Sequence, residues 1–313
     1  MKIRHSIKLA FSLGFFFIFS LTACANKKNG NSVSSSSKEE KVKTQIVNGE
    51  IELPKPPESL STPEEKARYI LMHFWDPLDF SDTTYTYSED FMEQNFANYV
   101  SLFPYATPEA RKESVFKLLN DSKVDHKAYV ILQDIAGKYL YDPNSPMLNE
   151  VSFIPFVEYE LESESSSAAT KEAAKAILES INKNRVGSIA ADFKFEDRKG
   201  NQLSLYTIFP DREMMLIFYD PDCENCKMIM GGIINNKNIN NAVETGQLGI
   251  LAIYSGDNKD AWKEGYNQYP ENWVVGYEPG LIEENELYDI RATPTIYILD
   301  KNKVVEEKDY RIQ

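Results

Sequence analysis

The sequence contains few cysteines and few basic residues, and both shortages exclude classes of protein. Cysteine occurs three times in 313 residues, at Cys24, Cys223 and Cys226, which excludes a scaffold of several disulfides and a zinc site with four cysteine ligands. Lys and Arg number 34 against 48 Asp and Glu, for a net charge of -14. Because contacts to phosphates require clustered positive charge, we expect no nucleic-acid partner.

The N-terminus has the pattern of an export signal. The apolar stretch 9–21 follows basic residues, and it is too short to span a hydrocarbon layer of ~30 Å as a helix. It ends in Leu21-Thr22-Ala23-Cys24, which resembles the bacterial lipobox, where the signal is cut before the cysteine and the cysteine carries the lipid. We therefore predict a lipoprotein signal peptide at residues 1–23 and a lipid on Cys24 that holds the protein on a membrane. A plain signal peptide with a chance cysteine and an uncleaved anchor are the alternatives.

The residues after Cys24 predict a tether and a location. Ala25-Asn26-Lys27-Lys28 are not acidic, whereas an early acidic run directs some Gram-negative lipoproteins to the outer surface. We therefore expect a lipid-anchored protein on the cell envelope membrane that faces the periplasm, with inner and outer membrane both open. Residues 24–52 are polar and have almost nothing to bury, so they are predicted to form a disordered tether.

Residues 53–184 are predicted to form an all-α domain. Thr62-Pro63-Glu64-Glu65 is a helix start signal, with a Thr cap, a Pro in the first turn and a Glu three residues after the cap. Further segments with helical spacing of apolar residues begin near residues 88, 107 and 125. An Ala-rich helix is expected at 168–183.

Residues 185–313 mix strand patterns with helical ones, which predicts an α/β domain. Residues 191–195 and 202–206 alternate polar and apolar side chains on either side of a turn, as in a hairpin. Continuous apolar runs at 214–219, 248–254 and 295–299 are typical of central strands buried on both faces.

Two cysteines separated by two residues follow the strand predicted at 214–219. Residues i and i+3 lie on one side of a helix, so the sulfurs of Cys223 and Cys226 can close a small ring. The first cysteine is expected at a helix N-terminus, where free N–H groups and the helix dipole favour a thiolate. This pattern predicts a redox pair, and an inert disulfide is the alternative.

The C-terminal part resembles the thioredoxin superfamily, and more narrowly the TlpA/ResA-like periplasmic thiol-disulfide oxidoreductases. The resemblance covers about residues 186–313 and rests on the cysteine pair, on the opening segment 186–193, and on Ala292-Thr293-Pro294-Thr295, which is similar to the family's cis-proline site. It implies an α/β thioredoxin-like domain in which Cys223 attacks, Cys226 resolves, and Thr293 and Pro294 form the floor of the substrate groove, with the Thr293 backbone pairing to the bound peptide.

The same resemblance implies the partners. They are proteins with thiols or disulfides and an upstream thiol electron donor, and no cofactor is required. The helical part is similar to an uncharacterised domain that precedes thioredoxin modules in some Gram-negative lipoproteins, which implies no known chemistry.

Some positions depart from the family pattern. Asp222 and Glu224 flank Cys223 and disfavour its anion, so we expect a thiol less acidic than in strongly oxidising relatives and a reductant or isomerase-like role. Ile217 stands where thioredoxins often keep a buried carboxylate, which leaves the proton acceptor of Cys226 unassigned. The usual C-terminal helix is missing, so either the helical domain or a partner is expected to cover that sheet face, or the domain is expected to be less stable.

Other chemistries fit the sequence less well. A peroxiredoxin-like peroxidase needs Thr or Ser three residues before its reactive cysteine, and this position is Asp220. A zinc site at the cysteine pair lacks further ligands, since His73 and His126, the histidines after the signal, lie in the helical part. We therefore expect no metal. The competing function is a lipid-anchored binding or scaffold protein whose thioredoxin-like domain is redox-inactive.

Overall fold

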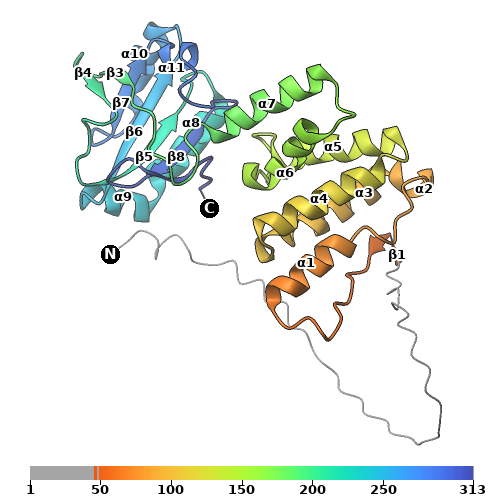
Figure 1. Ribbon diagram of the computed structural model, residues 1–313. Coiled ribbons are helices and arrows are strands. Elements are labelled where there is room, and N and C mark those ends of the chain that lie inside the picture. Colours follow the sequence, from red (N-terminus) through yellow and green to blue (C-terminus); the bar gives the residue numbers. More distant parts are fainter. Residues whose placement is uncertain (1–45, 48, 313) are drawn as a thin grey trace, which may run out of the picture. The chain divides into compact units, whose positions relative to one another are not determined.

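The structure is a computed structural model that describes residues 46–47 and 49–312 (Figure 1). The predicted signal peptide 1–23, the lipidation site Cys24 and the predicted tether as far as residue 45 lie outside the described residues. Within the described part, none of the helices combines the length and hydrophobicity needed to traverse a bilayer.

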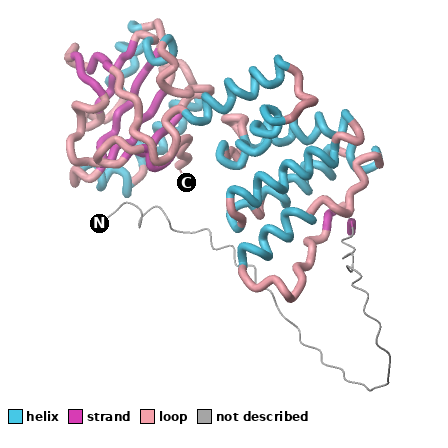
Figure 2. Tube along the Cα trace, viewed as in Figure 1, coloured by secondary structure: helices cyan, strands magenta, loops and turns pink. Residues whose placement is uncertain are grey.

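The N-terminal part is helical, as predicted (Figure 2). Its helices are α1 (Pro63–His73), α2 (Thr83–Thr86), α3 (Glu89–Val100), η2 (Phe103–Tyr105), α4 (Pro108–Ser122), α5 (His126–Leu140), α6 (Glu150–Glu162) and α7 (Ala168–Asn182). The predicted start of α1 is confirmed, because Thr62 and Glu65 form a reciprocal capping box. The apolar faces of these helices share one core, in which Phe74, Tyr99 and Leu119 are fully buried.

The tether predicted for residues 24–52 ends earlier than expected. Strands β1 (Ile46–Val47) and β2 (Glu50–Ile51) form a short hairpin that packs on the helical part. The Ile51 N–H donates to Asn95 Oδ1 at 2.8 Å, and Asn95 Nδ2 donates to the Gly49 carbonyl at 3.1 Å. Asn95 is fully buried on α3, so the hairpin supplies hydrogen bonds that this amide would otherwise lack. Two-residue strands are too short to give an alternating sequence pattern, which is why the prediction missed them.

The C-terminal part is built on a seven-stranded mixed sheet in the order β4-β3-β7-β6-β5-β8-β9. The strands are β3 (Lys194–Asp197), β4 (Gln202–Ser204), β5 (Glu213–Phe218), β6 (Leu248–Ser255), β7 (Val274–Glu278), β8 (Thr295–Leu299) and β9 (Val305–Glu307). The predicted hairpin is confirmed as β3 and β4, and the three buried runs as β5, β6 and β8. Strand β7 has no counterpart in the sequence prediction.

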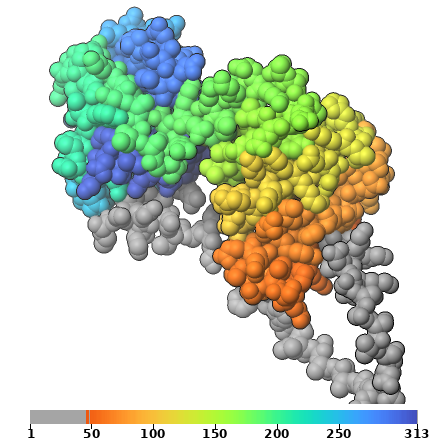
Figure 3. Space-filling view, viewed as in Figure 1, coloured from red at the N-terminus to blue at the C-terminus, as the bar shows by residue number. Residues whose placement is uncertain are grey.

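The remaining elements of this part are α8 (Glu224–Asn235), α9 (Lys237–Glu244), α10 (Lys259–Gly265), η3 (Tyr266–Gln268) and α11 (Leu281–Glu284). Helix α7 leads along the chain from the helical part into this α/β part (Figure 3). The order of an all-α part followed by an α/β part is as predicted.

One face of the sheet is covered by the α/β part's own chain. Side chains alternate along β5, so Met214, Leu216 and Phe218 share this face. They pack in one core with side chains from the segments that flank β3 and β4 and from the stretch that contains α11: Ala190, Phe193, Leu205, Ile208, Ile282 and Tyr288. The expectation that the helical domain or a partner covers the face usually covered by a C-terminal helix stays a prediction.

Candidate functional site

Cys223 and Cys226 lie where β5 leads into α8. Cys223 is the N-cap of α8, and its Sγ accepts the backbone N–H of Cys226 at 3.2 Å. The turn before it is held by Asp220, whose carboxylate accepts the Asp222 N–H at 2.8 Å and whose carbonyl accepts the Cys223 N–H at 3.2 Å. The predicted placement of the pair on the first turn of a helix is confirmed. Both are free thiols, with Cys223 partly exposed and Cys226 fully buried.

The loop before β8 brings Thr293 and Pro294 to the same place. The Thr293–Pro294 peptide bond is cis, and the Thr293 carbonyl accepts a hydrogen bond from Cys223 Sγ at 3.6 Å. Among the described residues, nothing accepts a hydrogen bond from the backbone N–H of Thr293. The predicted juxtaposition of the cysteine pair and the cis-proline is therefore observed, while the roles of these residues in catalysis and substrate binding stay predictions.

The environment separates the pKa values of the two thiols. Burial acts to raise the pKa of Cys223, but hydrogen bonds from the thiol and the backbone N–H of Cys226 outweigh it, so the pKa of Cys223 is lowered from its ordinary value. Burial raises the pKa of Cys226 to about 12. At neutral pH the exposed sulfur is thus the one that ionises more easily, and the buried sulfur keeps its proton. Our expectation of a thiol less acidic than in strongly oxidising relatives stays a prediction.

Two buried phenols that the sequence analysis did not single out lie near Cys226. Tyr219 follows β5 directly, and its ring lies 5.4 Å from that of Tyr269. Burial raises the pKa of Tyr269 to about 12 and that of Tyr219 further, and both phenols interact electrostatically with Cys226. Within the described residues the Tyr219 hydroxyl has no hydrogen-bond partner. The surroundings of Cys226 therefore include two phenols.

A groove of about 530 Å³ begins at the cis-proline loop. Its lining comes from four stretches of chain: α8, the cis-proline loop, the segment after β9, and the turn between α5 and α6 in the helical part. Pro143, Asn144 and Leu148 are the lining residues from that turn. Sequence reasoning missed them, because about 150 residues separate them from Thr293 and no local motif marks them.

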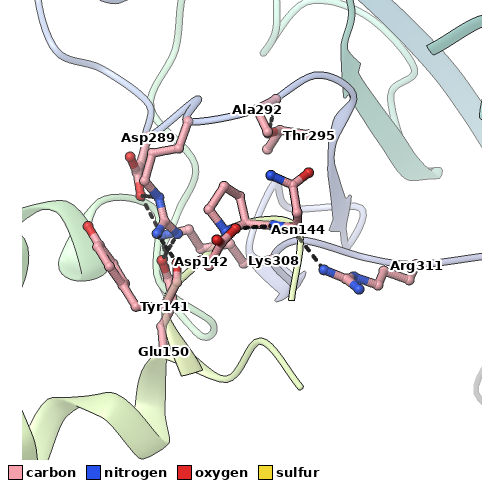
Figure 4. Close-up of polar contacts among 11 residues, drawn as sticks. Tyr141, Asp142, Asn144, Glu150, Asp289, Ala292, Thr295, Lys308 and Arg311 are labelled. Atoms are coloured by element: carbon pink, nitrogen blue, oxygen red, sulfur yellow. Dashed lines mark hydrogen bonds and ion pairs between the residues drawn. The ribbon is translucent and has the colours of Figure 1, made fainter. Parts of the chain in front are cut away.

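A buried cluster of charges joins the helical part to the base of the cis-proline loop (Figure 4). Arg291 pairs with Glu150 of α6, and its Nε lies 2.9 Å from Asp289 Oδ2. Lys308 Nζ lies 2.8 Å from Glu150 Oε2. The side chains of Glu150, Asp289 and Lys308 are each less than a tenth exposed. We call Glu150, Asp289, Arg291 and Lys308 the charge cluster.

No arrangement of three or more His, Cys, Asp or Glu side chains suited to a metal ion occurs in residues 46–47 and 49–312. His73, a histidine of the helical part, pairs with Asp76, and its Nδ1 atom lies 2.6 Å from Asp76 Oδ2.

Comparisons with known proteins agree with this architecture. A family model described as a domain of unknown function (DUF5106) matches residues 23–184. No curated protein matches the chain. A solved structure of a thioredoxin-like protein from Bacteroides caccae is 34% identical, with a TM-score of 0.75, and the match covers 83% of this chain and 94% of that one.

Two shorter solved structures match less of the chain. A conserved protein of unknown function from Bacteroides fragilis is 38% identical over 41% of this chain and 93% of its own, with a TM-score of 0.39. The thioredoxin domain of a thiol-disulfide oxidoreductase from Bacteroides vulgatus is 21% identical over 40% and 89%, with a TM-score of 0.36. The family model and the Bacteroides caccae structure decide the assignment: the chain belongs to the DUF5106 family and is a thioredoxin-like protein.

Proposed function

We propose that this protein is a thiol-disulfide oxidoreductase that acts on the disulfides of other proteins, which we call its clients. The observation that carries the proposal is the position of Cys223. Its sulfur is partly exposed at a helix N-terminus, 3.6 Å from the carbonyl oxygen that precedes a cis-proline. Cys226 lies behind it, buried and protonated.

The exchange takes place in two steps. The Cys223 thiolate attacks one sulfur of a client disulfide, a new bond forms between that sulfur and Cys223, and the other client sulfur leaves as a thiolate that takes up a proton. Cys226 then gives up its proton and attacks Cys223, which releases the second client thiol and leaves a disulfide between Cys223 and Cys226. The client gains two electrons and two protons, and a donor thiol of the cell must return them to the protein.

We propose that the protein reduces or isomerises the disulfides of its clients. Asp222 and Glu224 flank Cys223, and negative charge near a sulfur disfavours its thiolate. The nearest cation along the helix is neutralised, since Lys227 Nζ pairs with Glu224 Oε1 at 2.7 Å. A less stabilised thiolate makes the disulfide form less oxidising. A redox potential at the strongly oxidising end would contradict this direction.

The cellular location is also a proposal, and it rests on the sequence of residues 1–28. We propose that a lipid on Cys24 anchors the protein to the cell envelope membrane, facing the periplasm. Replacement Cys24→Ser should move the protein from the membrane fraction to the soluble fraction, whereas Cys223→Ser should leave it with the membrane. Retention of the Cys24→Ser protein in the membrane fraction would contradict the anchor.

The decisive experiment separates an oxidoreductase from a redox-inactive scaffold. The reduced protein is mixed with the aromatic disulfide dithiobis-nitrobenzoate, and release of thionitrobenzoate is followed by absorbance. Cys226→Ser should form a stable mixed disulfide through Cys223, and Cys223→Ser should not react. A scaffold would bind its partner equally well with both cysteines replaced, and its thiols would show no turnover with a dithiol donor.

A further inference from the structure

The groove shares Thr293 with the surroundings of the reactive sulfur. Thr293 lines it and also lies within 3.6 Å of Cys223 Sγ. A polypeptide whose sulfur reaches Cys223 therefore has neighbouring residues at the mouth of this groove. Its volume of about 530 Å³ falls within the ~300–1,000 Å³ of ordinary ligand sites, which is enough for side chains next to the reacting cysteine.

Apolar side chains line the groove from both sides, beside polar ones such as Asn225, Asp309 and Arg311. Met228 of α8 is 70% exposed, and together with Ile229 it offers one apolar surface. Leu148 of the helical part and Ile312 add apolar surface from other stretches of chain. Methionine side chains adapt to partners of different shape, so this surface suits apolar side chains of varied clients.

A polar group of the helical part is also available. The Asn144 side chain extends toward the cis-proline loop, where Ala292 and Thr295 lie (Figure 4). Its backbone N–H is bound to Asp142, but among the described residues its amide group makes no hydrogen bond. An exposed amide at the rim of a groove can pair with the backbone of an extended peptide.

The wall from the helical part is held in a fixed place. Arg291 precedes Thr293 by two residues, and Glu150 follows Leu148 by two residues. The ion pair between Arg291 and Glu150 therefore joins the two sides of the groove near its base. Arg291 also donates to the Tyr141 carbonyl and lies 4.0 Å from the Tyr141 ring centre. Arg311 Nη2 donates to the Pro143 carbonyl at 2.9 Å. Groups held in this way lose little freedom when a peptide binds.

We infer that the helical part takes part in client recognition. The turn at residues 143–148 forms one wall of the client groove, and the groove prefers an extended client segment with apolar side chains next to the reacting cysteine. This inference rests on the proposed function.

The test uses two pentapeptides, Gly-Leu-Cys-Leu-Gly and Gly-Ser-Cys-Ser-Gly, each with its cysteine linked to thionitrobenzoate. Release of thionitrobenzoate measures the rate at which the reduced protein attacks. The wild-type protein should react with the leucine peptide about tenfold faster than with the serine peptide, which corresponds to ~1.4 kcal/mol. Dithiobis-nitrobenzoate is too small to reach the wall and measures the intrinsic reactivity of Cys223.

Leu148→Asp should abolish the preference for the leucine peptide, and its rate with dithiobis-nitrobenzoate supplies the intrinsic reactivity to which its two peptide rates are referred. Val151→Asp is the matched control: Val151 is 60% exposed three residues further along and does not line the groove, so this variant should keep the preference. Leu148→Gln provides a milder second variant, and Asn144→Ala should lower both peptide rates equally.

The outcomes separate the two proposals. If the leucine preference is missing in the wild type, or persists in both Leu148 variants, the inference that the helical part recognises clients is wrong. The proposed oxidoreductase function is not affected by this result. If dithiobis-nitrobenzoate and both peptides fail to react, or react equally with the Cys223→Ser protein, the proposed function falls, and the inference about the wall falls with it.

Discussion

The two parts of the molecule contribute to the groove in different ways. The thioredoxin-like part supplies both the cysteine pair and the cis-proline loop. Cys223 of the pair donates a hydrogen bond to the Thr293 carbonyl of the loop. The helical part contains no cysteine among the described residues; it supplies a wall of the groove and the carboxylate of Glu150, which pairs with Arg291 at the start of that loop. The chemistry thus belongs to one part, whereas the shape of the groove belongs to both.

The sharpest test of this division is removal of the attacking sulfur. Cys223→Ser should reduce exchange with dithiobis-nitrobenzoate to the background rate, because a hydroxyl at this position is not ionised at neutral pH. Cys226→Ser should still attack once and stop at the mixed disulfide, which mass spectrometry detects. Exchange above background in the Cys223→Ser protein would place the chemistry elsewhere.

The two thiols should differ greatly in their response to pH. Alkylation by iodoacetamide requires a thiolate, so the labelling rate of Cys223 should rise with pH and reach half its maximum below the ordinary pKa of a cysteine. With a pKa of about 12, Cys226 should stay unlabelled at pH 8, where only about one in ten thousand molecules carries its thiolate.

Peptide mapping of the labelled protein measures both rates. The control is the same protein in denaturant, where the two cysteines should react at similar rates. Equal labelling in the folded protein would show that the environments of the two sulfurs do not differ as described.

The contact between the parts should matter for stability. Glu150→Gln removes one carboxylate from the charge cluster and leaves Arg291 and Lys308 with Asp289 alone, and breaking a buried ion pair costs about 3–5 kcal/mol. Glu113→Gln is a matched control, since Glu113 pairs with Arg68 where both side chains are about half exposed, and such a pair is worth about 1 kcal/mol or less. Urea unfolding measures both free energies, and equal values would show that the cluster does not join the parts as described.

A change in the helical part far from the groove should leave the chemistry untouched. Thr62→Ala removes the side-chain cap of α1 and should lower the free energy of unfolding by about 1 kcal/mol. Its rates with dithiobis-nitrobenzoate and with both peptides should equal those of the wild type. A loss of leucine preference in this variant would mean that recognition depends on general stability rather than on the wall.

Local patterns in the sequence were sufficient to predict much of the fold. The capping residue Thr62, the apolar run of β5 and the hairpin of β3 and β4 each depend on neighbours within a few residues, and each lies where it was predicted. The same holds for the cysteine pair, because the spacing of Cys223 and Cys226 alone places both sulfurs on one helical turn. The meeting of Thr293 with Cys223 is not local; it was predicted from the resemblance to a known family.

Only the tertiary structure decided what surrounds these residues. The burial of Ile51 against Asn95, the approach of Tyr269 to Cys226, and the pairing of Glu150 with Arg291 join positions that lie far apart in the chain. Such contacts arise when separate elements pack together, and the types and spacing of neighbouring residues do not predict them. The sequence by itself therefore determined that the two cysteines share one helical turn, whereas the packing of the two parts determined the walls of the groove beside them.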